Sequence, residues 1–239
     1  MNNDFETFAN EIPWFIEATD KVRVSKNDVE LETSQKFKDL FPNLSIMIEK
    51  ARKTVVTIND QNYTLFAWDD LEGTMCGWLC KMEDEASFPS ELIEEHKILL
   101  TNIGGIQESF NDFEEFSDAE LFTDNQNFLF IGSECKKGLG DWNDYYSECC
   151  EEEGHKEIDY SNMVSFVNEA NGTLTLYDTT TKKVLLFSHD HCFENVVCHE
   201  NQPEYTFHKF KDVDNFVDYV EQLARQWSSH IPLKGLFFL

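Results

Sequence analysis

The feature that most constrains the fold of this 239-residue chain is the stretch Met163–Trp227, which predicts antiparallel strands closed by a helix. Apolar and polar residues alternate after Val164 and again around Leu176, the pattern of strands with one buried face. Between them lies Asn171-Gly172, the pair most typical of a two-residue hairpin turn. Val184–Phe187 is a continuous apolar run that predicts a third strand. We therefore expect this stretch to begin as a β-meander.

An amphipathic helix is predicted at the end of the same stretch. After a loop containing His and Cys, Tyr205 and Phe207 resume the alternation, and Asp212 can cap a helix. Apolar residues then recur on one helical stripe: Val213, Phe216, Val217, Val220, Leu223 and Trp227. A helix lying on an antiparallel sheet is typical of the α+β class, so we expect an antiparallel-rich sheet with helices mainly on one face.

Residues 1–85 are predicted to form an N-terminal extension of helices and a hairpin, whose strands can join the same sheet. Phe5–Ala18 has helical spacing that Pro13 bends or breaks, and Phe37–Ala51 can be helical on both sides of Pro42. The polar segment Asp20–Gln35 is interpreted as a loop or a short helix. The period then changes to two, which predicts strands at Thr54–Ile58, Tyr63–Trp68 and Gly77–Cys80.

Residues 86–239 are predicted to form the main domain. A helix is expected to open at Phe88-Pro89-Ser90 and to end at Asn102-Ile103-Gly104-Gly105. Its buried face would be Leu92, Ile93, His96, Leu99 and Leu100. A strand is predicted at Phe128–Gly132, within an acidic insert that spans 108–160. Lys136–Asp159, rich in Gly, carboxylates and aromatic residues, is interpreted as a long loop.

Charge limits the kinds of partner this chain can have. It carries 46 acidic and 19 basic residues, a net charge of −27, so it repels nucleic acid and anionic membranes and attracts basic proteins. The excess is uneven, because 16 carboxylates stand against three Lys residues between Glu108 and Asp159, a net of −13. Such a surface either keeps the protein soluble or binds a cationic protein.

The remaining composition favours a cytoplasmic protein. Seven Cys residues without regular spacing do not suggest a disulfide framework. No apolar run approaches the ~20 residues that cross a bilayer, and the N-terminal segment lacks the basic and apolar regions of a secretory signal.

Three motifs, in this order, resemble the SUKH superfamily, the cell-wall-regulator-like domains that include many bacterial immunity proteins. The first is the segment FPSELIEEH running into LLTNIGG, similar to the family's leucine-proline helix opening and glycine turn. The second is the meander VSFVNEANGTLTLYDTTTKKVLLFSHDH, and the third is the closing helix DVDNFVDYV. The resemblance covers roughly residues 88–227.

The resemblance implies a non-enzymatic domain that binds another protein, commonly a toxin, and protects the producing cell. Nuclease toxins need basic active sites, which an acidic surface with aromatic anchors can occupy. The candidate partner-binding residues are Trp142, Tyr145, Tyr146, Glu148, Glu151, Glu152 and Glu153. The alternative is that these aromatic residues belong to the core. A regulatory scaffold on the same fold shares all these sequence features.

A metal-using enzyme or zinc-stabilised regulator is the other hypothesis. Metal-ligand residue types gather in one short segment: His189, His191, Cys192, Cys198 and His199. Their spacing is not that of the common structural zinc sites, so we expect no metal and no cofactor. The sequence also lacks the GxSxG, GxxxxGK[ST], GxGxxG and HExxH motifs, which argues against an enzyme.

Overall fold

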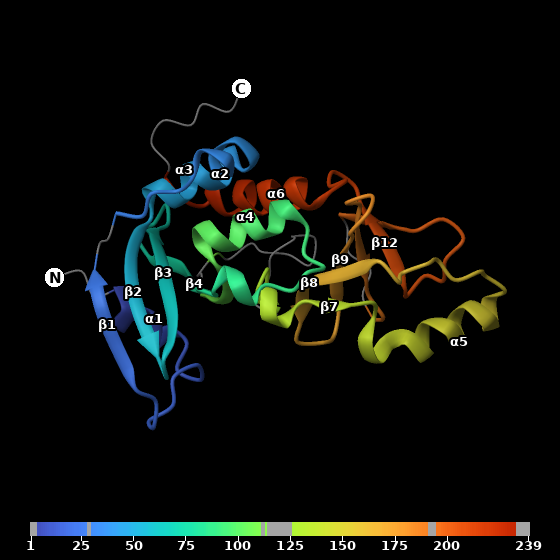
Figure 1. The fold of residues 1–239 in the computed structure, drawn as a ribbon, viewed down its shortest axis with the longest axis horizontal. Coiled ribbons are helices and arrows are strands. Elements are labelled where there is room, and N and C mark those ends of the chain that lie inside the picture. The colour runs from blue at the N-terminus through green and yellow to red at the C-terminus, as the bar shows by residue number, and fades with distance from the viewer. Residues whose placement is uncertain (1–3, 28–29, 111–112, 114–125, 191–194, 233–239) are drawn as a thin grey trace.

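A computed structural model describes residues 4–27, 30–110, 113, 126–190 and 195–232. These residues form one long twisted sheet with helices on both sides, and the fold is α+β as predicted (Figure 1). The strands are β1 (Val22–Asn27), β2 (Arg52–Ile58), β3 (Gln61–Asp69), β4 (Met75–Lys81), β5 (Gly105–Phe110), β6 (Gln126–Leu129), β7 (Lys136–Lys137), β8 (Met163–Glu169), β9 (Leu174–Asp178), β10 (Val184–Phe187), β11 (Val196–Cys198) and β12 (Phe207–Phe210). The helices are α1 (Asp4–Glu11), α2 (Gln35–Leu40), α3 (Pro42–Lys50), α4 (Glu94–Ile103), α5 (Asn143–Glu153) and α6 (Phe216–Ser228), with short 3₁₀ turns η1 (Glu85–Ser87), η2 (Gly132–Glu134) and η3 (Gly140–Trp142).

The strand order is nearly that of the chain: β1-β2-β3-β4-β5-β6-β8-β9-β10-β12-β11, with β7 paired to β8. All pairs are antiparallel. The strands of residues 1–85 continue directly into those of the predicted main domain, because β4 pairs with β5 along most of its length. The two predicted parts therefore share one sheet.

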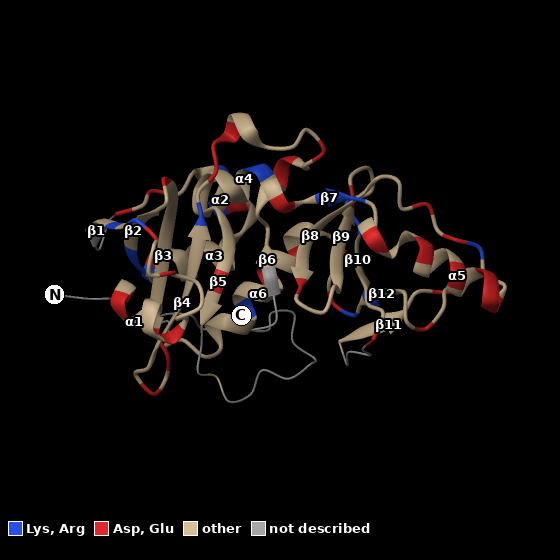
Figure 2. Ribbon diagram, turned by 90° about the horizontal axis from the view of Figure 1, so that it is seen from below, with Lys and Arg blue, Asp and Glu red and all other residues tan. Residues whose placement is uncertain are grey.

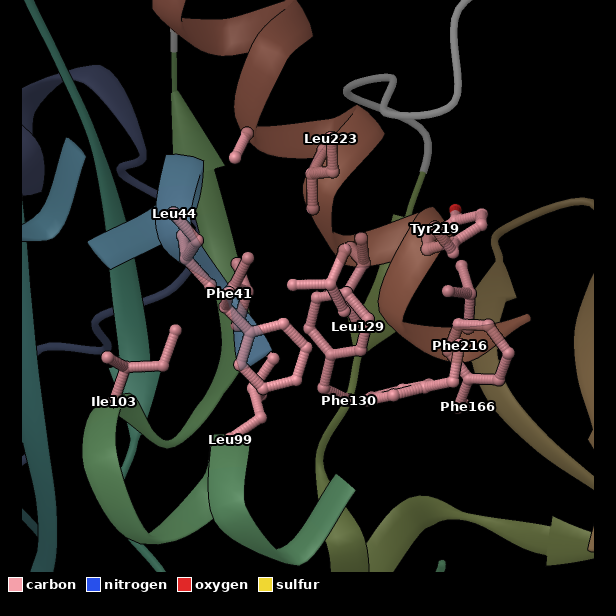
Figure 3. Close-up of a cluster of buried hydrophobic side chains, with 14 of the residues drawn as sticks. Phe41, Leu44, Leu99, Ile103, Leu129, Phe130, Phe166, Phe216, Tyr219 and Leu223 are labelled. Atoms are coloured by element: carbon pink, nitrogen blue, oxygen red, sulfur yellow. The ribbon is translucent and has the colours of Figure 1, made fainter. Parts of the chain in front are cut away.

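The front face of the sheet, which carries Phe66, Trp78 and Phe166, is covered by α2, α3, α4 and α6. Helix α6 spans both halves of the sheet. Near its end Trp227 lies 5.0 Å from Trp78 between ring centroids, and at its start Phe216 lies 5.2 Å from Phe166. Figure 3 shows side chains from α3, α4, α6 and the strands converging in this core. The predicted stripe of α6 is buried except for the half-buried Val217.

A buried carboxylate joins the N-terminal helices to α6. Glu221 of α6 is 5% exposed and accepts hydrogen bonds from the backbone N–H groups of Asn43 (3.0 Å) and Leu44 (3.1 Å). These donors lie in the first turn of α3, which has no side-chain cap of its own. A negative charge at a helix N-terminus is favourable, so Glu221 satisfies otherwise unpaired donors and fixes α3 against α6.

The back face carries two smaller cores at opposite ends of the sheet. At one end α1 buries Phe5, Phe8 and Ile12 against a cluster that includes Leu65 and Leu79. At the other end α5 covers a cluster formed by Leu139, Tyr146, Cys150, Met163, Leu174, Leu176, Leu185, Phe187 and Phe207. In the part of the chain that the structure describes, four helices cover one face and two the other, in agreement with the predicted bias toward one face.

Most predicted elements of residues 1–106 are confirmed. Two helices flank Pro42, and α1 ends at Glu11 before Pro13. The predicted hairpin is β2–β3, joined by Asn59 and Asp60 with φ of 49° and 69°, the conformation that two-residue hairpin turns require. The predicted buried face of α4 is buried, but the helix begins at Glu94, four residues after the expected opening at Ser90.

Four predictions were wrong. Part of Asp20–Gln35 is the edge strand β1, because Val22–Asn27 hydrogen-bonds to β2. The β8–β9 turn has three residues, 170–172, with only Gly172 at positive φ (91°) and Glu169 N–H bonded to Thr173 O (3.0 Å). Helix α6 is capped by Asn215 rather than by Asp212. Lys136–Asp159 is not a loop, since it contains β7, η3 and α5.

Candidate functional site

The candidate site is built on α5, which stands at one end of the molecule (Figures 1 and 2). Its inner residues recur at helical spacing and are buried or half-buried: Trp142, Tyr145, Tyr146, Cys149 and Cys150. The helix ends at Gly154, whose φ of 71° allows its N–H and that of His155 to bond to the carbonyls of Glu151 and Cys150. The inner face therefore anchors the helix and leaves its outer face free.

Tyr146 does not belong to the surface for which it was predicted. Its side chain is fully buried, with its ring 5.1 Å from that of Phe207. Its hydroxyl donates to Gln202 Oε1 and accepts the backbone N–H of Ile158 at 2.8 Å. Burial also raises the pKa of this phenol. Tyr146 is a core residue, the alternative that the sequence left open.

Trp142 and Tyr145 form the edge of the site. Both are half-buried, and their rings lie 5.7 Å apart in an edge-to-face arrangement. Trp142 stacks on His189 at 4.0 Å and donates its indole N–H to Gly172 O at 2.9 Å. Tyr145 donates to the backbone oxygen of Tyr205 at 3.3 Å. Each ring is thus held in place while part of it stays accessible, as interface anchors require.

Three of the predicted carboxylates, Glu148, Glu151 and Glu152, project away from the inner face of α5, whereas Glu153 ends the helix in line with Cys149 and Cys150. Glu148, Glu151, Glu152 and Glu153 are all exposed. Within the described residues the first three make no hydrogen bond or ion pair, and Glu153 contacts only His155, at 3.6 Å. From Asp141 to Asp159 eight carboxylates stand against Lys156, a net charge of −7 (Figure 2). The six carboxylates of the predicted insert between Asp112 and Asp124 lie outside the described residues.

The position of these carboxylates is unfavourable for the helix itself. Glu151, Glu152 and Glu153 occupy its last turn, which has no basic residue. The C-terminal end of a helix carries partial negative charge, and each exposed carboxylate there costs about 0.3–1 kcal/mol at low ionic strength. Residues that destabilise a helix and are not offset by a favourable contact are candidates for a functional role.

A cavity of about 410 Å³ opens beside the first residues of α5. It lies between β7, η3 and the β8–β9 hairpin, with Leu139, Leu174 and Trp142 forming apolar walls. Its charged residues are Glu134, Lys136 and Asp141. At Gly172 the backbone packs directly against Trp142, because a Cβ atom at this position would lie 2.8 Å from the Trp142 ring. Sequence reasoning missed this cavity, since its lining residues come from two stretches, 134–142 and 165–174, that only the tertiary fold brings together.

Several groups with strongly shifted pKa values lie in buried parts of the fold. Burial lowers the pKa of His96 to about 4, and its Nε2–H donates to Phe130 O at 2.6 Å while Nδ1 accepts from Tyr177. It is fully enclosed by the front core. Burial raises the pKa of Cys76 to about 12 and also raises that of the Cys80 and Cys135 thiols. These thiols are held neutral, unlike activated nucleophiles.

The described members of the His/Cys segment do not gather. His189 stacks on Trp142, Cys198 Sγ lies 3.7 Å from Glu204 O, and His199 Nδ1 lies 3.2 Å from Glu200 O. His191 and Cys192 lie outside the described residues. Among the residues that are described, no three His, Cys, Asp or Glu side chains could hold a metal ion together.

Comparisons with protein-family models, with curated proteins and with solved structures find no match for this chain. In the described part of the chain, no helix combines the length and the apolar character needed to cross a membrane.

Proposed function

We propose that this protein is a non-enzymatic binding protein that neutralises a basic, nuclease-type toxin through the acidic outer face of α5. The observation that carries the proposal is the set of exposed carboxylates Glu148, Glu151 and Glu152, which have no partner among the described residues. They occupy a helix whose inner face packs on one of the back-face cores. The SUKH-like order of motifs in the sequence supports the same function.

Physical chemistry links this surface to a basic partner. Exposed charges of one sign raise the rate of encounter with a partner of opposite charge, and half-buried aromatic rings at the edge supply affinity once contact is made. A nucleic-acid-binding toxin presents a positively charged groove in the site that it uses for phosphates. An acidic helix flanked by Trp142 and Tyr145 can fill such a groove and exclude the nucleic acid.

The first test is capture of the toxin domain encoded beside the gene, followed by association kinetics at several salt concentrations. We expect a one-to-one complex that abolishes the toxin's activity and whose association rate falls as salt is added. Neutralising Glu151 and Glu152 with Gln should slow association about tenfold or more at low salt, and much less at high salt.

The matched control removes the same charge at the other end of the molecule. Glu6 and Glu11 are exposed carboxylates of α1, so the variant E6Q/E11Q changes the net charge as E151Q/E152Q does. If the rate depends only on net charge, both variants will slow association equally, and the α5 surface is not the interface. Loss of rate confined to E151Q/E152Q supports the proposal, and a rate unchanged in both contradicts it.

A further inference from the structure

The cavity beside α5 has polar groups without partners. Its rim carries the carboxylates of Glu134 and Asp141, the ammonium of Lys136 and the amide of Asn168. Among the described residues, none of these four side chains makes a hydrogen bond or an ion pair. By contrast Ser165, on the same wall, exchanges hydrogen bonds of 3.2 Å with the backbone of Lys136. The four free groups are therefore available to a ligand.

The walls and size of the cavity suit one long side chain. Leu139 and Leu174 are buried apolar residues, and the Trp142 ring closes one side. Its volume of about 410 Å³ is near the lower end of the range of ligand sites, about 300–1,000 Å³. A helix or strand of a partner is too wide to enter, but an extended side chain with an aliphatic stem can lie against these walls.

The charged residues around the cavity favour a cationic ligand. Two carboxylates stand against one ammonium at the rim, and the surrounding segment from Asp141 to Asp159 has a net charge of −7. An anion would enter against this field. A guanidinium presents a planar set of donors that matches carboxylates and packs against aromatic rings, which an ammonium does less well. Lys136 and the Asn168 amide remain as donors for the carbonyl groups of a peptide backbone.

We infer that this cavity receives an arginine side chain from a loop of the basic partner, with Asp141 and Glu134 pairing the guanidinium and Trp142 lining its approach. The inference rests on the proposed function, since it names the contact that the α5 surface would add to charge attraction. Helix α5 has 11 residues, about 16 Å at the rise of an α-helix, so one partner can cover both the cavity and the glutamates at the far end.

The test uses N-acetyl-arginine methylamide as the probe and its neutral isostere, N-acetyl-citrulline methylamide, as the control. Binding is followed by NMR through the Trp142 indole N–H and the Asn168 side-chain amide. We expect saturable shifts of both signals with the arginine probe and none with citrulline. Neutralising both rim carboxylates (E134Q/D141N) should weaken binding about tenfold or more, because two charge-assisted contacts are lost.

The variant K136Q should have the opposite effect. Removing the ammonium leaves the rim more negative, so the arginine probe should bind a few-fold more tightly if charge attraction dominates. E6Q/E11Q, which removes two charges from α1 at the opposite end of the sheet, should alter probe affinity less than twofold because those carboxylates lie far from the cavity. Equal binding of citrulline, tighter binding after E134Q/D141N, or no saturable shift up to the solubility limit would each overturn the inference.

Failure of this inference can be told apart from failure of the proposed function. Salt-sensitive capture of a basic toxin without any response to the arginine probe would remove the cavity from the interface and leave the α5 surface in place. Saturable arginine binding with the expected pattern of variants, but no capture of a basic partner, would keep the cavity as a guanidinium site and remove the toxin-binding function.

Discussion

The two helices on the back face, α1 and α5, use their negative charge in different ways. Both are short, both are acidic, and both are seated by aromatic residues at opposite ends of one sheet. In α1, Asp4 lies in the first turn, is 5% exposed and pairs with Arg52 at 3.0 Å. Arg52 in turn binds Asp69 through two hydrogen bonds of 2.9 Å. The charge of α1 is thus part of the structure.

In α5 the negative charge has no such role. Three of its four glutamates lie in the last turn, where the helix dipole disfavours them, and all four are exposed. The comparison teaches that acidity alone does not identify a binding surface in a chain of net charge −27. What distinguishes α5 is the combination of carboxylates without partners, an unfavourable end of the helix, and accessible aromatic rings beside them.

The largest expected change in unfolding free energy comes from the buried inner faces of α1 and α5, where the two helices should behave alike. Phe8 and Tyr146 are each fully buried in the back-face cores. Truncating either to Ala should lower the free energy of unfolding by about 3–5 kcal/mol, because each leaves a cavity. Chemical denaturation measures both. A loss of less than about 1 kcal/mol for Tyr146→Ala would mean that α5 is a peripheral appendage, and the comparison would break down.

The second effect should separate the helices. Asp4→Asn removes a charged partner of Arg52 at a nearly buried position, and we expect a loss of about 1.5–3 kcal/mol. Glu152→Gln removes a charge that pairs with nothing in the described residues, so its unfolding free energy should not decrease. Paired denaturation curves decide this. A similar loss in both variants would show that α5 also depends on its carboxylates.

The sequence predicted the strands and helices of the front layer well, because their burial is strong and periodic. The α6 stripe from Val213 to Trp227 and the hairpin at Thr54–Trp68 are visible without any tertiary information. Edge strand β1 was missed because its only apolar residues, Val22 and Val24, are 38% and 44% exposed, so no buried face marks the strand in the sequence. Its pairing with β2 decides its conformation, and pairing is not a local property.

Helix α5 could have been found. The spacing of Trp142, Tyr145, Tyr146, Cys149 and Cys150 fits an amphipathic helix, but the Gly and carboxylate content of the segment favoured a loop. Which aromatic residue is accessible was not predictable. Tyr145 and Tyr146 are adjacent, and the second is buried by packing against residues distant in the sequence, such as Phe187 and Phe207. The surface of a site depends on tertiary contacts that composition does not encode.

A smaller effect is expected from pH on the part of the back face that carries Glu108. Glu108 of β5 pairs with Leu79, which belongs to the α1 core, and burial raises the pKa of its carboxyl to about 7 although Trp14 donates a hydrogen bond to it. The native state therefore holds a proton that the unfolded state releases above its ordinary pKa near 4.5. This contribution to stability is present below that value and is lost as pH rises through 7.

Replacing this carboxyl tests the sign. Glu108→Gln should flatten the decrease in unfolding free energy between pH 4.5 and 7, measured by urea denaturation at intervals of pH. The variant E151Q/E152Q, with exposed carboxylates at the α5 end, should keep the wild-type profile in this interval. If the unfolding free energy instead rises across this interval, and rises equally in the wild type and in Glu108→Gln, then Glu108 does not hold its proton.

The smallest expected effect is also the sharpest comparison, because it reverses sign between the two helices. Glu6 lies in the first turn of α1, where the helix dipole favours a carboxylate, whereas Glu151 lies in the last turn of α5. Glu6→Gln should lower the unfolding free energy by a few tenths of a kcal/mol, and Glu151→Gln should raise it by about as much at low salt. Added salt should reduce both differences, since both positions are exposed.

If Glu151→Gln lowers the unfolding free energy instead, the carboxylate stabilises the fold, and the α5 glutamates can no longer be described as charges without a structural role. If it raises stability while slowing capture of a basic partner, the chain keeps these glutamates at a cost in folding because they bind.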